Sequence, residues 1–170
     1  MRSRREFLQL GLAVSAVPFA GTVFPTGLSG WAGDATPLYA AVFDERFTAS
    51  RAFAGEARRL GLPTRGITGD VTALWYHDLD RRWQQGPVAI AGLTYASELF
   101  CLDILARAHQ MRVVFRAEHR YQADARLEHV LAGPASVLQA AVDVGNRGAD
   151  WSRQFAQLVT RVPRERTPAT

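Results

Sequence analysis

The chain has 170 residues, 48% of them hydrophobic and 21% charged, which suits a single globular domain and excludes a disordered or fibrous protein. The net charge is +4, but three arginines lie within the first five residues, so the rest of the chain is too weakly basic for a nucleic-acid-binding surface. The single cysteine, Cys101, excludes an intramolecular disulfide and a cysteine-rich metal site.

The N-terminus carries the pattern of an export signal. Arg4 and Arg5 are followed, after one residue, by Phe7 and Leu8, and then by a moderately apolar run over residues 10–28 that glycines and prolines interrupt. This stretch resembles a twin-arginine signal peptide, and the resemblance covers about the first thirty residues.

Removal of this segment is the expected outcome. Small-x-small patterns at 30–32 and 33–35 would allow cleavage, giving a mature chain that begins just before Pro37 and has no stable membrane span. An amphipathic or anchoring N-terminus is the alternative.

The resemblance also implies something about partners. Twin-arginine export moves proteins that have already folded, and its passengers tend to hold a cofactor or to travel with a subunit that does. No cofactor motif is evident in this chain. The resemblance therefore implies the export machinery and a co-exported subunit as partners, and a periplasmic or secreted location in a bacterium.

The remainder, residues 36–163, is expected to form one α/β domain, followed by a disordered tail at 164–170. The hydrophobic pattern and the turn residues predict strands at 38–43, 62–68, 87–92, 111–121 and 126–132. They predict helices at 47–60, 70–85, 95–108, 134–144 and 150–162. The stretch from Pro87 to Ala108, a buried strand that turns directly into a mostly apolar helix, is the predicted centre of the domain.

Charges and apolar residues fix the pairing of the last two strands. Opposing Tyr121 to Leu127 keeps both apolar faces together and sets Arg120 against Glu128, whereas a shift by two residues would oppose like charges. The preferred register places His119 opposite His129.

Because strands and helices alternate before this hairpin, the expected fold is a three-layer, largely parallel α/β sheet of the flavodoxin or Rossmann type. Counting from 38–43, the expected order is 2-1-3-4, with the fifth strand antiparallel beside the fourth.

In such sheets ligands bind beyond the carboxyl ends of the strands, near the point where the strand order reverses. The residues that follow the first three strands are therefore the candidate ligand-binding residues: Asp44, Glu45, Arg46, Thr68, Asp70, Thr94, Tyr95 and Ser97.

Two readings of the turn at Thr94 stay open. Gly92 to Ala96 stands where a nucleophile elbow would, with Thr in place of Ser, so Asp44, Thr94 and Ser97 are candidate catalytic residues. The simpler reading makes Thr94 the N-cap of its helix, whose first amides could bind a carboxylate or phosphate with help from Ser97 and Arg46.

Structural roles are sufficient to explain the histidines and the cysteine. His119 and His129 could supply two metal ligands, but two are insufficient, and buried histidines packed under the terminal helices explain them as well. His77 and His109 read as surface residues, and Cys101 as an inert core residue.

Two functions from different classes remain. The first is an exported accessory or small-ligand-binding protein that partners a periplasmic redox or metabolic enzyme. The second is a small hydrolase or transferase using Asp44, Thr94, Ser97 and a histidine. The enzyme predicts a deep pocket at the strand ends, with a histidine or carboxylate close to Thr94 or Ser97; the accessory protein predicts a shallow or apolar cleft and an exposed apolar patch.

Overall fold

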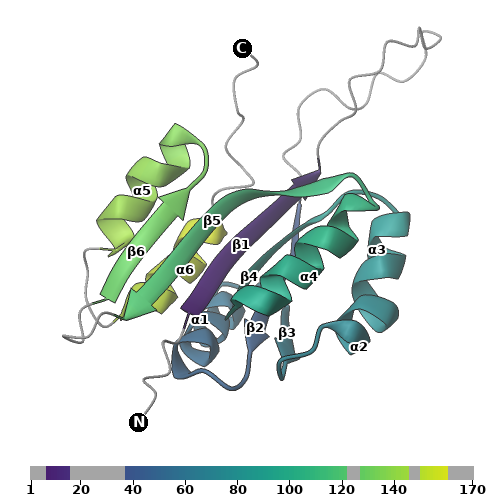
Figure 1. Cartoon of the computed structure of the whole chain (residues 1–170), viewed down its shortest axis with the longest axis horizontal. Helices are drawn as coiled ribbons and strands as arrows, with labels where there is room; N and C mark the ends of the chain where they lie inside the picture. Colours follow the sequence, from purple (N-terminus) through teal and green to yellow (C-terminus); the bar gives the residue numbers. More distant parts are fainter. Residues whose placement is uncertain (1–6, 16–36, 122–126, 146–149, 161–170) are drawn as a thin grey trace, which may run out of the picture.

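A computed structural model of the whole chain describes residues 7–15, 37–121, 127–145 and 150–160 (Figure 1). The strands are β1 (Phe7–Ser15), β2 (Leu38–Asp44), β3 (Thr64–Ile67), β4 (Ala89–Tyr95), β5 (Met111–Tyr121) and β6 (Leu127–Ala132). The helices are α1 (Thr48–Arg59), α2 (Thr72–Leu74), the π-helical turn η1 (Trp75–Leu79), α3 (Asp80–Gln84), α4 (Ala96–Arg107), α5 (Ala135–Gly145) and α6 (Trp151–Val159). Arg4, Arg5, the small-x-small patterns, Arg126 and the predicted disordered tail lie outside the described residues.

The strands form one mixed sheet in the order β3-β2-β4-β1-β5-β6. Strands β3, β2 and β4 are parallel, as the sequence predicts, and β5 and β6 form the predicted antiparallel hairpin. The α/β class is therefore confirmed. The predicted order is interrupted at one place, because β1 lies between β4 and β5 and runs antiparallel to both.

The pairing within the hairpin is the predicted one. Tyr121 pairs with Leu127, Arg120 with Glu128, and His119 with His129. Charge complementarity and the apolar alternation were sufficient to set this register, because a shifted register would have placed like charges opposite each other.

Apolar residues on the two faces of the sheet belong to two separate clusters. Ala41 and Phe43 of β2 pack in a cluster with α1, α5 and α6, whereas Val42, which points the other way, packs with α2, η1, α3 and α4. Figure 1 shows α3 and α4 in front of the sheet and α1 and α6 behind it. Both faces of β2 and β4 are thus buried, which explains why these two strands have nearly continuous apolar sequences.

The turn after α1 follows a helix-ending motif. Gly61, with φ +83°, donates its amide to the carbonyl of Arg58, and Leu62 donates to Ala57. These two bonds form a Schellman motif, in which glycine accepts the left-handed backbone without strain. The motif turns the chain back towards the edge strand β3.

Four predicted environments were wrong. Glu56 of α1, expected on the solvent side, is buried, because Arg59 and Gln157 both donate to its carboxylate. Leu60, expected inside, is 40% exposed at the end of the helix. Cys101 is exposed, since the apolar surface of α4 is wider than the strip that the sheet covers. His109 is partly buried, because it packs against Trp75 and Trp83 and bonds Asp80.

Candidate functional site

The candidate site lies at the carboxyl ends of β2 and β4, which are parallel neighbours. Helix α1 follows β2 and packs in one apolar cluster, whereas α4 follows β4 and packs in the other. The chain therefore leaves the two strand ends towards opposite faces of the sheet. This divergence is the geometry that opens a crevice at a switch point of an α/β sheet.

Asp44 and Arg46 form the centre of the site. Asp44 ends β2 and is fully buried, and both of its carboxylate oxygens accept hydrogen bonds from Arg46. The Arg46 amide also donates to Oδ1 of Asp44, at 3.0 Å. The hydrogen bonds to Asp44 raise the pKa of Arg46, and the negative charges of Asp44 and Glu98 add to this effect.

Glu98, in the first turn of α4, binds the same guanidinium. Nη2 of Arg46 lies 2.8 Å from Oε1 of Glu98, a residue that is only 5% exposed. The other oxygen of Glu98 accepts a hydrogen bond from the Ser97 hydroxyl, at 2.8 Å. The side chain of Arg46 thus links the end of β2 to the start of α4.

The buried side chain of Ser50 links the ends of β2 and β4 by two hydrogen bonds. The Asp44 amide donates to Oγ of Ser50 at 2.8 Å, and the Ser50 hydroxyl donates to the carbonyl of Leu93 in β4. Ser50 has no exposed surface. Its two bonds tie β2, α1 and β4 together and satisfy backbone groups that the sheet ladder leaves over.

The rim of the site contains an aromatic pair and a glycine. The rings of Phe47 and Tyr95 stack with centroids 6.0 Å apart, and the Arg46 guanidinium carbon lies 5.4 Å from the Phe47 ring centroid. Gly69, in the loop after β3, lies against the same guanidinium: a Cβ there would come within 2.4 Å of Nη1 of Arg46. Arg46 is therefore contacted by residues at or after the ends of all three parallel strands.

The remaining candidates take structural positions. Thr94 is the last but one residue of β4, is buried, and donates to the carbonyl of Tyr95 at 3.2 Å. It is not an N-cap, because β4 continues three residues beyond the predicted end and α4 begins only at Ala96. Asp70 accepts the Thr72 amide at 2.8 Å, but it lies one residue before Val71, the N-cap of α2, and so is not the predicted N-cap. The Glu45 carboxylate packs against Gly66 of β3, and Thr68 is exposed.

The charges at the site decide what it can bind. Two carboxylates, Asp44 and Glu98, share one guanidinium, so an anionic ligand at the start of α4 would meet an excess of negative charge. Ser97 has its hydroxyl bonded to Glu98, whose other oxygen Arg46 holds. This arrangement orients the polar groups towards one another rather than towards a substrate.

The histidines lie elsewhere. His119 and His129 form a pair on β5 and β6, with their Nδ1 atoms 2.5 Å apart, and both rings pack against Trp151 and Phe155 of α6. His119 is fully buried, and among the described residues its Nε2 has no hydrogen-bond partner. Burial lowers the pKa of both histidines, and the charge of His129 lowers that of His119 further.

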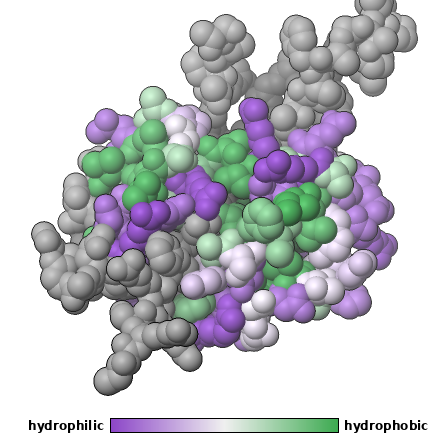
Figure 2. Space-filling model, in the orientation of Figure 1, coloured by the Kyte–Doolittle hydropathy of each residue, from purple (hydrophilic) through white to green (hydrophobic). Residues whose placement is uncertain are grey.

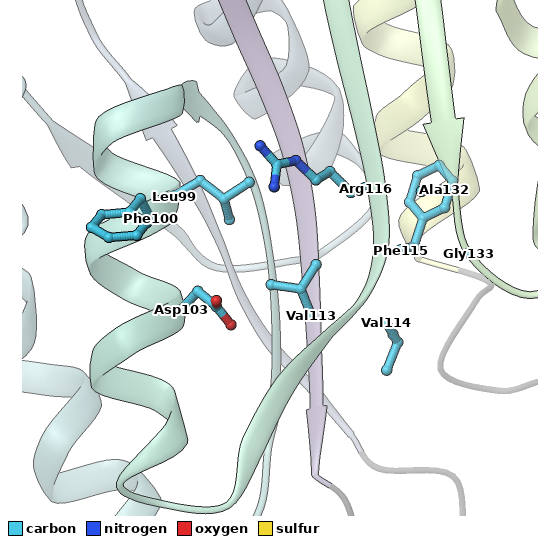
Figure 3. Close-up of a pocket in the computed structure, with 9 residues that line it drawn as sticks. All are labelled: Leu99, Phe100, Asp103, Val113, Val114, Phe115, Arg116, Ala132 and Gly133. Atoms are coloured by element: carbon cyan, nitrogen blue, oxygen red, sulfur yellow. The ribbon is translucent and has the colours of Figure 1, made fainter.

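A cavity of about 350 Å³ lies beside α4 rather than at the strand ends. Leu99 and Asp103 of α4 point into it from one side, and Val113 and Arg116 of β5 line the opposite side (Figure 3). A second cavity, of about 20 Å³, lies beneath α4 and touches Thr94. Asp44, Arg46, Glu98 and Ser97 are not among the residues that line either cavity.

Two large apolar side chains are exposed on the outer face of α4. Phe100 is 64% exposed and Ile104 is 50% exposed. Phe100 also borders the larger cavity, and in Figure 2 an apolar patch lies over the position of α4. Exposed large apolar side chains that gather beside a cavity are typical of an interaction surface.

Sequence reasoning missed Glu98 and Ser50. From the sequence, Glu98 is an ordinary acidic residue in the first turn of a helix, where its negative charge interacts favourably with the helix dipole. Ser50 reads as a polar residue near a helix start. The available signal was the chain order: both residues lie in the first turn of a helix that follows a strand at the switch point, Ser50 in α1 after β2 and Glu98 in α4 after β4.

Among the described residues, no three or more His, Cys, Asp and Glu side chains gather as a metal site would require. In the same part of the chain, every helix is too short or too polar to cross a membrane. No protein-family model, curated protein or solved structure matches this chain.

Proposed function

We propose that this chain is an exported accessory or small-ligand-binding protein that works with a periplasmic redox or metabolic enzyme. The supporting observation is a contrast between two surfaces. At the strand ends Arg46 binds both Asp44 and Glu98, whereas Phe100 and Ile104 are exposed on α4 beside a cavity of about 350 Å³ with a mixed polar and apolar lining. A protein that binds a partner needs an exposed apolar surface such as that of α4, whereas an enzyme needs polar groups at the strand ends that are free to contact a substrate.

The proposal includes the twin-arginine route of export and a periplasmic or secreted location. Its support is the resemblance of the sequence around Arg4 and Arg5. It also includes the finer fold assignment, a three-layer sheet of the flavodoxin type, supported by the parallel order of β3, β2 and β4 and by apolar clusters on both sheet faces. No cofactor of its own is assigned to the chain.

Export is tested by fractionating cells that produce the full chain with a C-terminal tag. We expect the wild type in the periplasm or medium, shortened at its N-terminus. The double substitution Arg4→Lys and Arg5→Lys should leave the full-length protein in the cytoplasm, and Arg2→Lys, outside the pair, is the matched control. Equal distribution of all three proteins would contradict the proposal.

The second candidate function, a small hydrolase or transferase, has one contact in its favour. The Ser97 hydroxyl donates to the Glu98 carboxylate, as a nucleophile does to a general base. A panel of ester, amide and phosphoester substrates tests it, with Ser97→Ala as the diagnostic variant. Turnover by the wild type that Ser97→Ala abolishes would favour the enzyme over the accessory protein.

A further inference from the structure

The strands β4 and β5 leave room for one strand between them. Both pair antiparallel with β1, so they run parallel to each other at two strand spacings, and α4 connects them (Figure 1). The position held by β1 is called here the strand slot. Its borders are residues 90–95 of β4 and 111–120 of β5, with Gly11 paired to both Gly92 and Arg116.

The strand in this slot is part of the segment that resembles an export signal. Phe7, the first residue of β1, follows the arginine pair by two positions. A mature chain that begins just before Pro37 would lack β1 entirely. Both neighbouring strands would then present unpaired amides and carbonyls inside the sheet, which folded proteins avoid.

Packing on the back of the sheet opposes direct closure of the slot. Phe115 of β5 stacks on Phe155 of α6, with centroids 6.4 Å apart. The same helix is fixed to α1 by Gln157, whose side-chain amide lies 2.7 Å from the Glu56 carboxylate. Moving β5 against β4 would shift it by about 4.8 Å, one strand spacing, and would break these contacts.

We propose that in the exported protein the strand slot receives an extended segment of a partner protein, which runs antiparallel to both β4 and β5. This inference rests on the proposed export. The chain's own residues 7–15 then fill the slot only in the precursor, so that the domain folds before export. Addition of a peptide strand to exposed strand edges is an established mode of recognition, in which main-chain hydrogen bonds supply affinity.

The slot sets the chemistry of the incoming strand. Positions 8, 10 and 12 of β1 pair with His119, Ala117 and Phe115, which are buried on the α6 side of the sheet. Alternate positions of the partner strand must therefore be apolar. Position 11 lies between Gly92 of β4 and Arg116 of β5, on the face of the sheet opposite to positions 10 and 12.

Strand exchange in the full chain tests the proposal. A protease recognition sequence is introduced within residues 16–36, the folded protein is cut there, and a fluorescent synthetic peptide of residues 5–16 is added during dilution from moderate urea. We expect the peptide to bind, and hydrogen exchange to show that amides of β4 and β5 lose protection after removal of the native segment and regain it with the peptide. A peptide with Gly11→Pro should bind at least roughly tenfold more weakly, because proline removes a ladder hydrogen bond.

Three outcomes would overturn the proposal. The cut protein could keep β4 and β5 protected with no peptide bound, which means that the two strands pair directly. The proline peptide could bind as well as the native one. The cut protein could form a dimer, detected by native mass spectrometry. A second copy of the chain, and not a partner protein, would then fill the slot. Failure of export alone is recognised separately, by cytoplasmic location of a protein that still exchanges the strand.

Discussion

Arg46 donates to both carboxylate oxygens of Asp44, with Nε 2.9 Å from Oδ1 and Nη2 2.5 Å from Oδ2. The Asp44 side chain has no exposed surface, whereas that of Arg46 is 46% exposed. The buried carboxylate is thus neutralised by a side chain that reaches in from the surface. This relationship makes the site at the strand ends a structural cluster whose loss should be measurable as stability.

Arg46→Met should lower the free energy of unfolding by about 2–3 kcal/mol, because it leaves a buried carboxylate unpaired while water can partly reach the vacated volume. Chemical denaturation at pH 7 measures the loss. Arg107→Met is the control, since Arg107 is 70% exposed and pairs with Asp103 one helical turn away; it should cost less than about 0.5 kcal/mol. Equal losses of unfolding free energy in the two variants would show that the Asp44–Arg46 pair stabilises the domain no more than an exposed ion pair does.

Adding Asp44→Asn to Arg46→Met should recover part of the lost stability, since the uncompensated charge is removed. A double variant that is less stable than Arg46→Met alone would show that Asp44 acts through contacts other than the ion pair.

Two glycines with nearly the same backbone provide a matched test of the packing around Arg46. Gly61 has φ +83° with open space around it, whereas Gly69 has φ +90° with the Arg46 guanidinium against it. Gly61→Ala should cost about 1 kcal/mol of backbone strain. Gly69→Ala should cost more, because its Cβ displaces the guanidinium from Asp44. In an Arg46→Met background the extra cost should disappear, and a double-mutant cycle that shows no coupling would contradict this packing.

The sequence predicted well those features that local chemistry determines. The α/β class, the parallel strands and the hairpin register all depend on apolar periodicity, turn residues and charge pairing, which the sequence displays directly. The sequence also predicted that Asp44, Arg46 and Ser97 lie close together, because they follow strands that end at one edge of the sheet. Here the order of elements along the chain carried the three-dimensional information.

The sequence did not predict what depends on distant contacts. The burial of Glu56 requires Gln157, about a hundred positions away, and the exposure of Cys101 depends on how much of α4 the sheet covers. The place of β1 was missed for a different reason. From residue 8 to 15 apolar residues alternate with small or polar ones, as in a strand, but the same residues also carry the pattern of a signal segment, which predicts their removal rather than a strand.

The buried histidine pair should make the domain sensitive to acid. Burial lowers the pKa of His119 and His129 below the ordinary value of 6.5, so the unfolded chain takes up protons that the folded chain excludes. Stability is therefore full above pH 6.5 and falls as the pH decreases below it, by up to about 1.4 kcal/mol per pH unit for each fully shifted histidine. Urea denaturation at pH 7.5, 6 and 5 measures the slope.

His119→Phe should reduce this slope, because phenylalanine keeps the ring contacts to Trp151 and Phe155 and does not titrate. His129 retains its own contribution, and replacing both histidines should flatten the profile between pH 6.5 and 5 further. If the single variant and the wild type lose stability with identical slopes, the pair does not cause the acid sensitivity.

The exposed face of α4 should be dispensable for folding. Phe100→Gln and Ile104→Gln should change the free energy of unfolding by less than about 0.5 kcal/mol, since both side chains are at least half exposed. Leu102→Ala, on the buried face of the same helix, should cost about 2–5 kcal/mol. The accessory role further predicts that the glutamine variants fold normally but lose their partner. Large destabilisation by Phe100→Gln would show that this face packs within the domain.

Native mass spectrometry of the tagged protein, isolated from the periplasm under mild conditions, tests the central claim most directly. The account predicts a chain that has lost its N-terminal segment and is bound to a second, different polypeptide, with the complex reduced in Phe100→Gln. A full-length chain isolated alone from the cytoplasm, or a monomer that turns over a substrate without any partner, would contradict it.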